Sequence, residues 1–153
     1  MADATQADAD AVIALWHACG LTRPWNDPHG DFERALAGPS STVLVLRDES
    51  TIAASVMVGH DGHRGWVYYL ATDPARRRLG HGRAMMTAAE GWLRARRVPK
   101  LQLMVREGND AALAFYAALG LEPQPVVTLG RFLETEDGHA RSTLEWRGDR
   151  AIG

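Results

Sequence analysis

A glycine-containing turn rich in arginine is the part of the sequence best suited to bind a charged ligand. Residues 69–72 form a largely apolar run, three arginines follow at 76–78, and Gly80 and Gly82 precede a segment of helical periodicity. Amide N–H groups at a helix start lack partners within the helix and lie at its positive end, so they bind phosphate. The turn therefore predicts a phosphate site, although an ordinary tight turn with solvated arginines would have the same sequence pattern.

The residues around the glycines argue against two other phosphate-binding turns. No Lys-Ser or Lys-Thr pair follows them, as a Walker A loop requires. A dinucleotide-binding fingerprint needs a third glycine after the first strand of its unit, whereas several predicted strands precede Gly80. Neither a Walker A loop nor a Rossmann turn is therefore predicted.

Size and composition predict one domain over residues 1–153. The chain is 46% hydrophobic and 24% charged, with a net charge of −2, and no aromatic residues interleave with the arginines at 76–78. We therefore expect no nucleic-acid partner. Cys19 is the single cysteine, no signal-peptide pattern opens the chain, and no apolar run approaches the roughly 20 residues of a membrane span. These features favour a cytoplasmic protein that does not bind membranes. His60 and His63 lack a third soft ligand nearby, so no metal site is expected.

A mixed α/β arrangement must position the turn. Helical periodicity predicts four helices. The first stops at Gly20, and the second is short and spans about 31–37. The third follows the arginine-rich turn and has a stripe of inward-facing apolar residues, and the last runs from Asn109 to Gly120. A capping box at Thr5 and Asp8 precedes the first helix. The inward stripe comprises Met85, Ala88, Ala89, Trp92 and Leu93. Runs of β-branched and aromatic residues predict strands at 43–46, 51–58, 66–72, 101–105, 126–132 and 142–146.

The order of these signals resembles the GCN5-related N-acetyltransferase superfamily. The turn matches its signature Arg/Gln-x-x-Gly-x-Gly/Ala at residues 77–82, and the last helix carries Phe115-Tyr116 and ends in Leu-Gly-Leu at 119–121, as members often do. Several further segments resemble the bacterial YpeA-type acetyltransferases, namely 23–28, 61–65, 68–70, 99–102 and 129–131. The sequence departs from the family at Arg78, where glycine is frequent, and at His81, where an apolar residue is usual.

The resemblance implies a fold and a cofactor. The fold is α/β (α+β), with a mostly antiparallel twisted sheet of about six to seven strands, flanking helices and a splayed parallel pair formed by 66–72 and 101–105. Acetyl-CoA would be the acyl donor, with its pantetheine arm between the splayed strands and its 3′-phosphate near Arg76, Arg83 or a neighbour. The implied cofactor-binding residues are Leu70, Ala71, Thr72, Arg77, Arg78, Leu79, Gly80, His81, Gly82, Arg83, Asn109 and Tyr116.

Tyr116 is the candidate catalytic residue. A phenol with a reference pKa of about 10 is protonated at neutral pH and can donate a proton to a departing thiolate. A core aromatic with a satisfied hydroxyl is the competing interpretation. Asn109 likewise binds the cofactor or only caps its helix, and the two roles are compatible.

The acceptor site is less clearly marked in the sequence. Trp25, Asn26, Asp27 and Tyr68 are the candidates for substrate contact, because an irregular loop with aromatic and polar groups suits recognition. Asp27, Glu33, His63 and Tyr68 are candidate bases, although a structural role is favoured for each.

The predicted function is that of an N-acetyltransferase that moves an acetyl group to a primary amine of a small molecule or peptide by direct attack on the thioester. The alternative is an acyl-CoA-binding sensor, or a degenerate transferase without efficient catalysis. An exposed sheet edge would also allow a homodimer.

Overall fold

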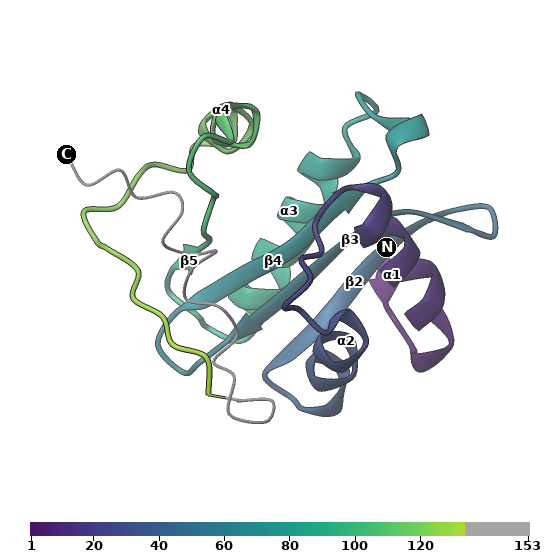
Figure 1. The fold of residues 1–153 in the computed structure, drawn as a ribbon, viewed down its shortest axis with the longest axis horizontal. Coiled ribbons are helices and arrows are strands. Elements are labelled where there is room, and N and C mark those ends of the chain that lie inside the picture. The colour runs from purple at the N-terminus through teal and green to yellow at the C-terminus, as the bar shows by residue number, and fades with distance from the viewer. Residues whose placement is uncertain (134–153) are drawn as a thin grey trace. The chain divides into compact units, whose positions relative to one another are not determined.

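One mixed sheet organises the described part of the chain (Figure 1). The structure is a computed structural model that describes residues 1–133. The chain divides into two compact units, Met1–Gly120 and Leu121–Gly153. Every described helix and strand lies in the first unit. The extent of a single domain over the whole chain stays a prediction.

The strands follow one another across the sheet in chain order, β1 to β5. The first four are paired antiparallel, and β4 and β5 are parallel. The predicted α/β class and mostly antiparallel sheet are therefore confirmed. The strands are β1 Ala2–Asp3, β2 Ser41–Asp48, β3 Thr51–His60, β4 Gly65–Thr72 and β5 Leu101–Gln102, and the α-helices are α1 Ala9–Ala18, α2 Pro28–Ala37, α3 His81–Ala95 and α4 Asp110–Ala118.

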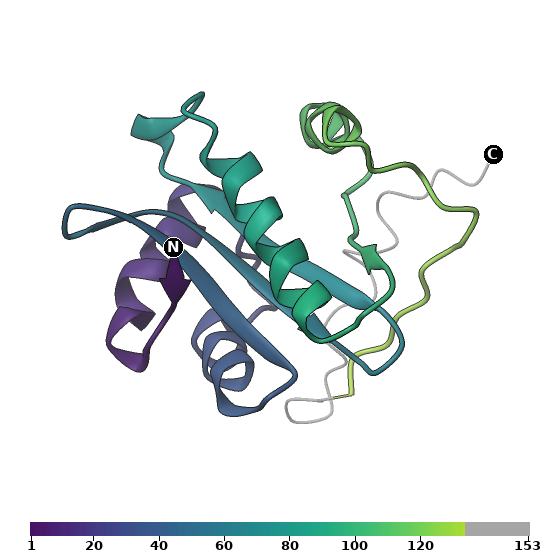
Figure 2. The same cartoon turned by 180° about the vertical axis from the view of Figure 1, so that it is seen from behind.

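Helices cover both faces of the sheet. Figures 1 and 2, taken from opposite sides, show α1 and α2 on one face and α3 on the other. On the first face Trp16 and Phe32 are fully buried against Val43 and Val45. None of the described helices is long and apolar enough to cross a membrane.

Helix α3 packs on the sheet through part of the predicted stripe. Its buried residues are Met85, Met86, Ala89 and Leu93, whereas the predicted Ala88 and Trp92 are only half-buried. A Cβ atom at Gly65 would lie 2.5 Å from Cδ1 of Leu93. Glycine at the start of β4 therefore lets the last turns of α3 rest directly on the strand.

Two predicted strands differ from the structure. The strand expected at 101–105 is only two residues long, and 126–132 contains no strand. The side chains of Val126, Val127 and Leu129 are exposed. A strand needs a neighbour for its backbone hydrogen bonds, and no described strand pairs with this segment. Five strands are therefore described instead of six to seven, and the strand expected at 142–146 lies outside the described residues.

Candidate active site

The turn between β4 and α3 has the backbone of an anion-binding helix start. Asp73 caps a short 3₁₀ turn, Pro74–Arg76, by accepting a hydrogen bond from the Ala75 amide (3.0 Å). Gly80, at φ 77°, then forms the N-cap of α3. The Ala84 amide donates to the Gly80 carbonyl (3.0 Å), which closes the first helical turn. The N–H groups of residues 81–83 precede this bond, so none of them has a partner within the helix.

Arg78 has a left-handed backbone in this turn. Its φ is 65°, a conformation that costs an L-residue about 1–2 kcal/mol and costs glycine much less. The frequent glycine of related sequences at this position therefore has a backbone reason. The conformation remains in this chain with an arginine in its place, so the turn keeps its shape and gains a positive charge.

The arginines of the turn differ in their partners. Arg76 pairs with Asp48 and, at 3.6 Å, with Asp73. Because its guanidinium already has these partners, Arg76 is less available to bind a phosphate. Arg77, Arg78 and Arg83 are exposed and form no ion pair within residues 1–133. Three positive charges are therefore available where the amides of α3 begin. The neighbouring Leu79 side chain is 68% exposed.

Gly82 lies where three elements meet. A Cβ atom added to it would be 3.1 Å from Cζ of Phe115 on α4 and 3.9 Å from Oγ1 of Thr72 at the end of β4. The absence of a side chain therefore serves packing as well as access to the backbone. Through Phe115, α4 is held against the start of α3.

The parallel pairing of β4 and β5 stops after two residues. Gly65 is paired with Leu101 and Trp66 with Gln102, and the Gly65 amide donates to the Lys100 carbonyl (2.8 Å). From residue 67 to 72, β4 has no described strand on that side. This is the opening expected for a pantetheine arm. At its far end the Thr72 carbonyl accepts a hydrogen bond from the Cys19 thiol (3.2 Å).

A β-bulge interrupts β4 next to this opening. Ser55 is paired with Ala71 and Met57 with Tyr68, so Tyr69 and Leu70 together face a single residue of β3. Tyr69 has φ 51°, in the left-handed region. A bulge of this kind turns a strand locally and re-aims its side chains. Two adjacent residues, Tyr68 and Tyr69, consequently project on the α1 and α2 side of the sheet.

Three elements, α1, α2 and β3, hold the bulge of β4 in place. The Tyr69 hydroxyl donates to Asp31 Oδ2 on α2 (2.7 Å), and its ring stacks on Trp16 of α1 with centroids 4.0 Å apart. The Trp16 indole N–H in turn donates to Ser55 on β3 (3.1 Å). Burial, reinforced by the hydrogen bond to Asp31, raises the pKa of Tyr69. Several contacts therefore keep Tyr69 in its left-handed conformation, as is usual for strained residues that persist in folded proteins.

Sequence reasoning missed the bulge and its anchors. Period-two alternation predicts that Tyr68 and Tyr69 lie on opposite faces, and only the doublet of large aromatics within one strand hinted otherwise. Trp16 and Asp31 lie far from Tyr69 in the chain, and no local pattern connects them.

The two residues proposed from the last helix lie at its ends. Asn109 is the N-cap of α4, because its side chain accepts from the Ala112 amide (3.2 Å). Tyr116 is half-buried and meets Phe115 edge to face, with centroids 5.0 Å apart. Burial raises the pKa of Tyr116, and its hydroxyl has no hydrogen-bond partner among the described residues. The phenol is therefore protonated at neutral pH and free to donate.

The predicted acceptor loop has strong structural roles. Asp27 caps α2 by accepting from the Gly30 amide (3.0 Å), and the Asn26 amide donates to the Arg23 carbonyl (2.9 Å). The Trp25 ring lies 5.9 Å from the guanidinium of Arg106, a residue of the segment that joins β5 to α4. The loop before α2 therefore contacts the segment that follows β5.

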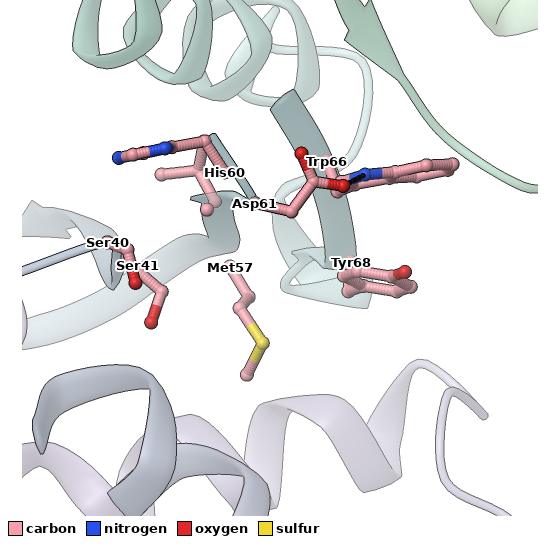
Figure 3. A pocket seen from close by; sticks show the side chains of 9 residues that line it. Ser40, Ser41, Met57, His60, Asp61, Trp66 and Tyr68 are labelled. Carbon is pink, nitrogen blue, oxygen red and sulfur yellow. Dashed lines mark hydrogen bonds between the residues drawn. The ribbon is translucent and has the colours of Figure 1, made fainter. Parts of the chain in front are cut away.

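An open groove of about 250 Å³ lies over the N-terminal half of β4. Figure 3 shows the Trp66 and Tyr68 side chains extending in the same direction from β4, with the Asp61 carboxylate against the indole. Of the four predicted acceptor residues only Tyr68 lines this groove, and its side chain is 44% exposed. The lining includes Ser41, Met57, His60, Asp61, Trp66 and Tyr68.

The candidate bases are weak in this geometry. Burial, and secondarily the Asp61 charge, raises the pKa of Tyr68, which keeps its phenol protonated near neutral pH. Asp27 is occupied as a helix cap, while Glu33 is exposed on α2. The His63 amide donates to Asp61 (2.8 Å) in an exposed turn. Within residues 1–133 no group of three or more His, Cys, Asp or Glu side chains could hold a metal ion.

Comparisons with known proteins place this geometry in a family. The model of the acetyltransferase (GNAT) family matches residues 8–121, so the chain belongs to that family. An acetyltransferase of Yersinia pestis is 46% identical over 128 residues, which are 84% of this chain and 91% of the relative. An acetyltransferase of Pectobacterium atrosepticum has the same identity and coverage. The predicted family is confirmed, and the protein is an acetyltransferase.

Solved structures of low identity share the fold. AAC(6′)-Iy, in complex with the bisubstrate analogue CoA-S-monomethyl-acetylneamine, has a TM-score of 0.73 at 13% identity, covering 86% of this chain and 95% of that one. Aminoglycoside 6′-N-acetyltransferase AAC(6′)-IG from Acinetobacter haemolyticus has a TM-score of 0.71 at 16% identity, covering 87% and 98%. At these identities the likeness supports the fold alone.

Proposed function

We propose that the protein transfers the acetyl group of acetyl-CoA to a primary amine by direct attack of the amine on the thioester carbonyl. The N–C bond forms as the C–S bond breaks, the amine loses a proton, and the departing thiolate gains one. Family membership supports acetyl transfer in general, and the turn before α3 supports a donor rich in phosphate.

The donor would lie along β4 and the start of α3. Backbone groups of Leu70 and the amide of Thr72, whose carbonyl already accepts from the Cys19 thiol, would pair with the amides of pantetheine as an added strand does. The free amides at 81–83 and the exposed Arg77, Arg78 and Arg83 can bind the phosphates. Ala71 is buried, so only its backbone is offered to the donor.

Tyr116 would protonate the thiolate. Its burial keeps the phenol neutral, and its unpaired hydroxyl leaves a proton to give. General acid catalysis of this kind contributes roughly 10²–10⁴-fold to a rate. Asn109, whose side chain already caps α4, would help the donor only by fixing the position of that helix.

The observation that carries this proposal is the left-handed Arg78 beside the free amides of α3. The chain supplies a matched control at the other end of the same helix. Arg97 also has positive φ, 59°, is also exposed and also lacks an ion pair within the described residues. Glycine fits both backbones, so Arg78→Gly and Arg97→Gly should each change the free energy of unfolding by no more than about 1 kcal/mol.

The test is calorimetric titration of the intact protein and both variants with acetyl-CoA. Arg78→Gly should weaken binding about tenfold through loss of one charge-assisted phosphate contact. Arg97→Gly should bind as the intact protein does. Equal weakening in both variants, or no binding by the intact protein, would overturn the donor site.

Turnover is then measured as free-thiol release with a panel of primary amines. Release that depends on the amine supports N-acetyl transfer. Tight binding of acetyl-CoA without release with any amine would favour the alternative function, an acyl-CoA sensor or degenerate transferase.

A further inference from the structure

We infer that the acceptor amine carries a second positive charge, which Asp61, Trp66 and Tyr68 hold in the groove beside β4. This inference rests on the proposed function, since it names the substrate class of the acceptor side of the same site. The groove lies on the face of the sheet that carries Tyr68, and Tyr68 directly precedes the bulge that borders the donor opening.

The carboxylate of Asp61 is fixed before any ligand arrives. Its Oδ1 accepts from the amides of His63 (2.8 Å) and Arg64 (2.7 Å), and its Oδ2 accepts from the Trp66 indole N–H (3.2 Å). These donors, led by the Arg64 amide, lower the pKa of Asp61 to about 2. A carboxylate accepts about four hydrogen bonds, so one position stays open on a side chain that faces solvent.

Two aromatic faces stand next to that charge. Trp66 and Tyr68 are alternate residues of β4, opposite Gly59 and Met57 of β3, so both project from the same face of the sheet. A Cβ atom at Gly59 would lie 3.0 Å from Cβ of Ser41, so the glycine lets the start of β2 pack closely at this edge of the groove. An ammonium group over a tryptophan or tyrosine ring is attracted to the negative face of the ring, and a carboxylate nearby adds to that attraction. Rings and a carboxylate together are the chemistry of ammonium recognition.

The positive groups nearest to Asp61 are directed elsewhere. The Arg64 guanidinium donates to the His63 carbonyl (3.1 Å) and forms no ion pair with Asp61. Nδ1 of His60 accepts from the Gly62 amide (3.3 Å). Among residues 1–133, no lysine or arginine lines the groove. The carboxylate is therefore open to a cation supplied by a ligand.

The length of β4 sets the spacing of the two charges on the acceptor. A strand rises about 3.3 Å per residue, so Leu70 at the bulge is roughly 7 Å along the strand from Tyr68 and roughly 13 Å from Trp66. If the reacting amine lies at the bulge, a second ammonium over these rings needs an aliphatic spacer of several carbons. Hexamethylenediamine has such a spacer, and aminohexanol is its matched partner with one ammonium replaced by a hydroxyl.

The experiment measures kcat/KM for both compounds with saturating acetyl-CoA, in the intact protein and in Asp61→Asn and Trp66→Leu. The intact protein should prefer the diamine by about fivefold to tenfold. Each variant should lower kcat/KM for the diamine more than for aminohexanol, so that the preference for the diamine falls. Trp66→Leu keeps the backbone hydrogen bonds of Asp61, so it separates loss of the ring from any disturbance of the turn by Asp61→Asn.

A binding measurement independent of turnover accompanies the kinetics. The indole N–H resonance of Trp66, assigned by its absence in Trp66→Leu, should shift with hexamethylenediamine and not with aminohexanol. Equal kcat/KM for the two compounds in the intact protein would overturn the inference and leave acetyl transfer standing. A selective shift without thiol release from these compounds or from any amine of the panel would instead overturn the proposed function and keep the cation site. No shift, and no thiol release with any amine, would overturn both.

Discussion

The turns at the two ends of β4 are organised differently, one mainly by backbone groups and the other by a side chain. After its C-terminal end, at Thr72, the chain makes a phosphate-type turn out of backbone: left-handed residues at 78 and 80, free amides at the start of α3, and exposed arginines. Before its N-terminal end, at Gly65, the turn is organised around one side chain, Asp61, and the groove beside it is walled by rings. The first end is positive and the second negative.

This difference matches what each end would have to recognise. The phosphates of a donor have one shape and charge, so a backbone site with little dependence on side chains is enough. An acceptor varies between enzymes of one fold, and groove side chains can be exchanged without rebuilding the sheet. Changes at the C-terminal end should therefore affect every reaction equally, whereas changes at the N-terminal end should alter the choice of amine.

The strongest way to break the donor end is to add bulk at Gly82. Gly82→Val would press on Phe115 and cover the amides, so acetyl-CoA affinity should fall at least roughly a hundredfold, which corresponds to about 2.8 kcal/mol. Overpacking should also lower the free energy of unfolding by about 1–3 kcal/mol. Calorimetric titration and thermal unfolding measure the two effects.

Gly91→Val is the matched control for that prediction. Gly91 lies in the same helix, and a Cβ atom there meets nothing within 4 Å. Valine and glycine have similar helix propensities, so affinity and stability should both stay near those of the intact protein. If Gly82→Val behaved like Gly91→Val, the start of α3 would not be the phosphate site.

Removing the hydroxyl of Tyr116, and separately that of Tyr68, tests which tyrosine takes part in the chemical step. Tyr116→Phe should lower kcat by about 100-fold, as loss of a general acid does, with acetyl-CoA affinity unchanged. Stability should hardly change, because the hydroxyl has no described partner. Tyr68→Phe, at the other end of the site, is the control, because its hydroxyl lies at the acceptor groove and kcat should stay within a small factor. Single-turnover thiol release gives both values, and an unaltered kcat in Tyr116→Phe would make that tyrosine a packing residue.

Local patterns predicted the turn and the helix cap at the candidate donor end. The glycines of the turn and the Asn109 cap lie within a few residues of the backbone that they shape, because turn and cap chemistry depends on such short spans. Binding of a donor there stays a prediction. The strands at 43–46, 51–58 and 66–72 were found to within two residues at each end. The role of Arg76 was less accessible, because its partner Asp48 is supplied by the distant end of β2.

The acceptor end could not be predicted in the same way. Its groove exists because β2, β3 and β4 lie side by side, which places Ser41 next to Gly59 and Gly59 next to Trp66. The bulge at Tyr69 depends on Trp16 and Asp31, which only tertiary packing brings near. Spacing within the sequence carries no signal for such contacts, so the sequence analysis named Tyr68 of the groove but did not name Asp61 or Trp66 as acceptor residues. Acceptor contacts by Trp25, Asn26 and Asp27 stay predictions.

The bulge between the two ends can be weakened without touching either. Tyr69→Phe keeps the ring stacked on Trp16 and removes the hydrogen bond to Asp31, which should lower the free energy of unfolding by about 1–2 kcal/mol. Asp31→Asn keeps an acceptor oxygen and should cost less. Denaturant titration measures both, and unchanged stability in Tyr69→Phe would mean that the hydroxyl does not anchor the bulge.

The pH dependence of stability provides a second measure of that anchor. Folding raises the pKa of Tyr69, so its contribution is fully present below pH 10, its ordinary value, and is lost as pH rises toward the folded value. The intact protein should therefore lose stability above about pH 10 more steeply than Tyr69→Phe does. Parallel curves would contradict the hydrogen bond.

The smallest expected effect concerns Asp61 itself. Its pKa is lowered from 3.8 to about 2, first by the Arg64 and His63 amides and only then by the Trp66 indole. Because folding lowers this pKa, the stabilising contribution is present above pH 4 and is lost as pH falls toward 2. An NMR titration of the Asp61 carboxyl should show a low pKa in the intact protein and only a partial rise in Trp66→Phe. A return to about 3.8 in that variant would make the ring the main support of the charge. A partial rise would mean that backbone amides mainly keep the Asp61 carboxyl ionised, as backbone groups also form the turn at the other end of β4. The aromatic rings would then act mainly on the selectivity for the amine.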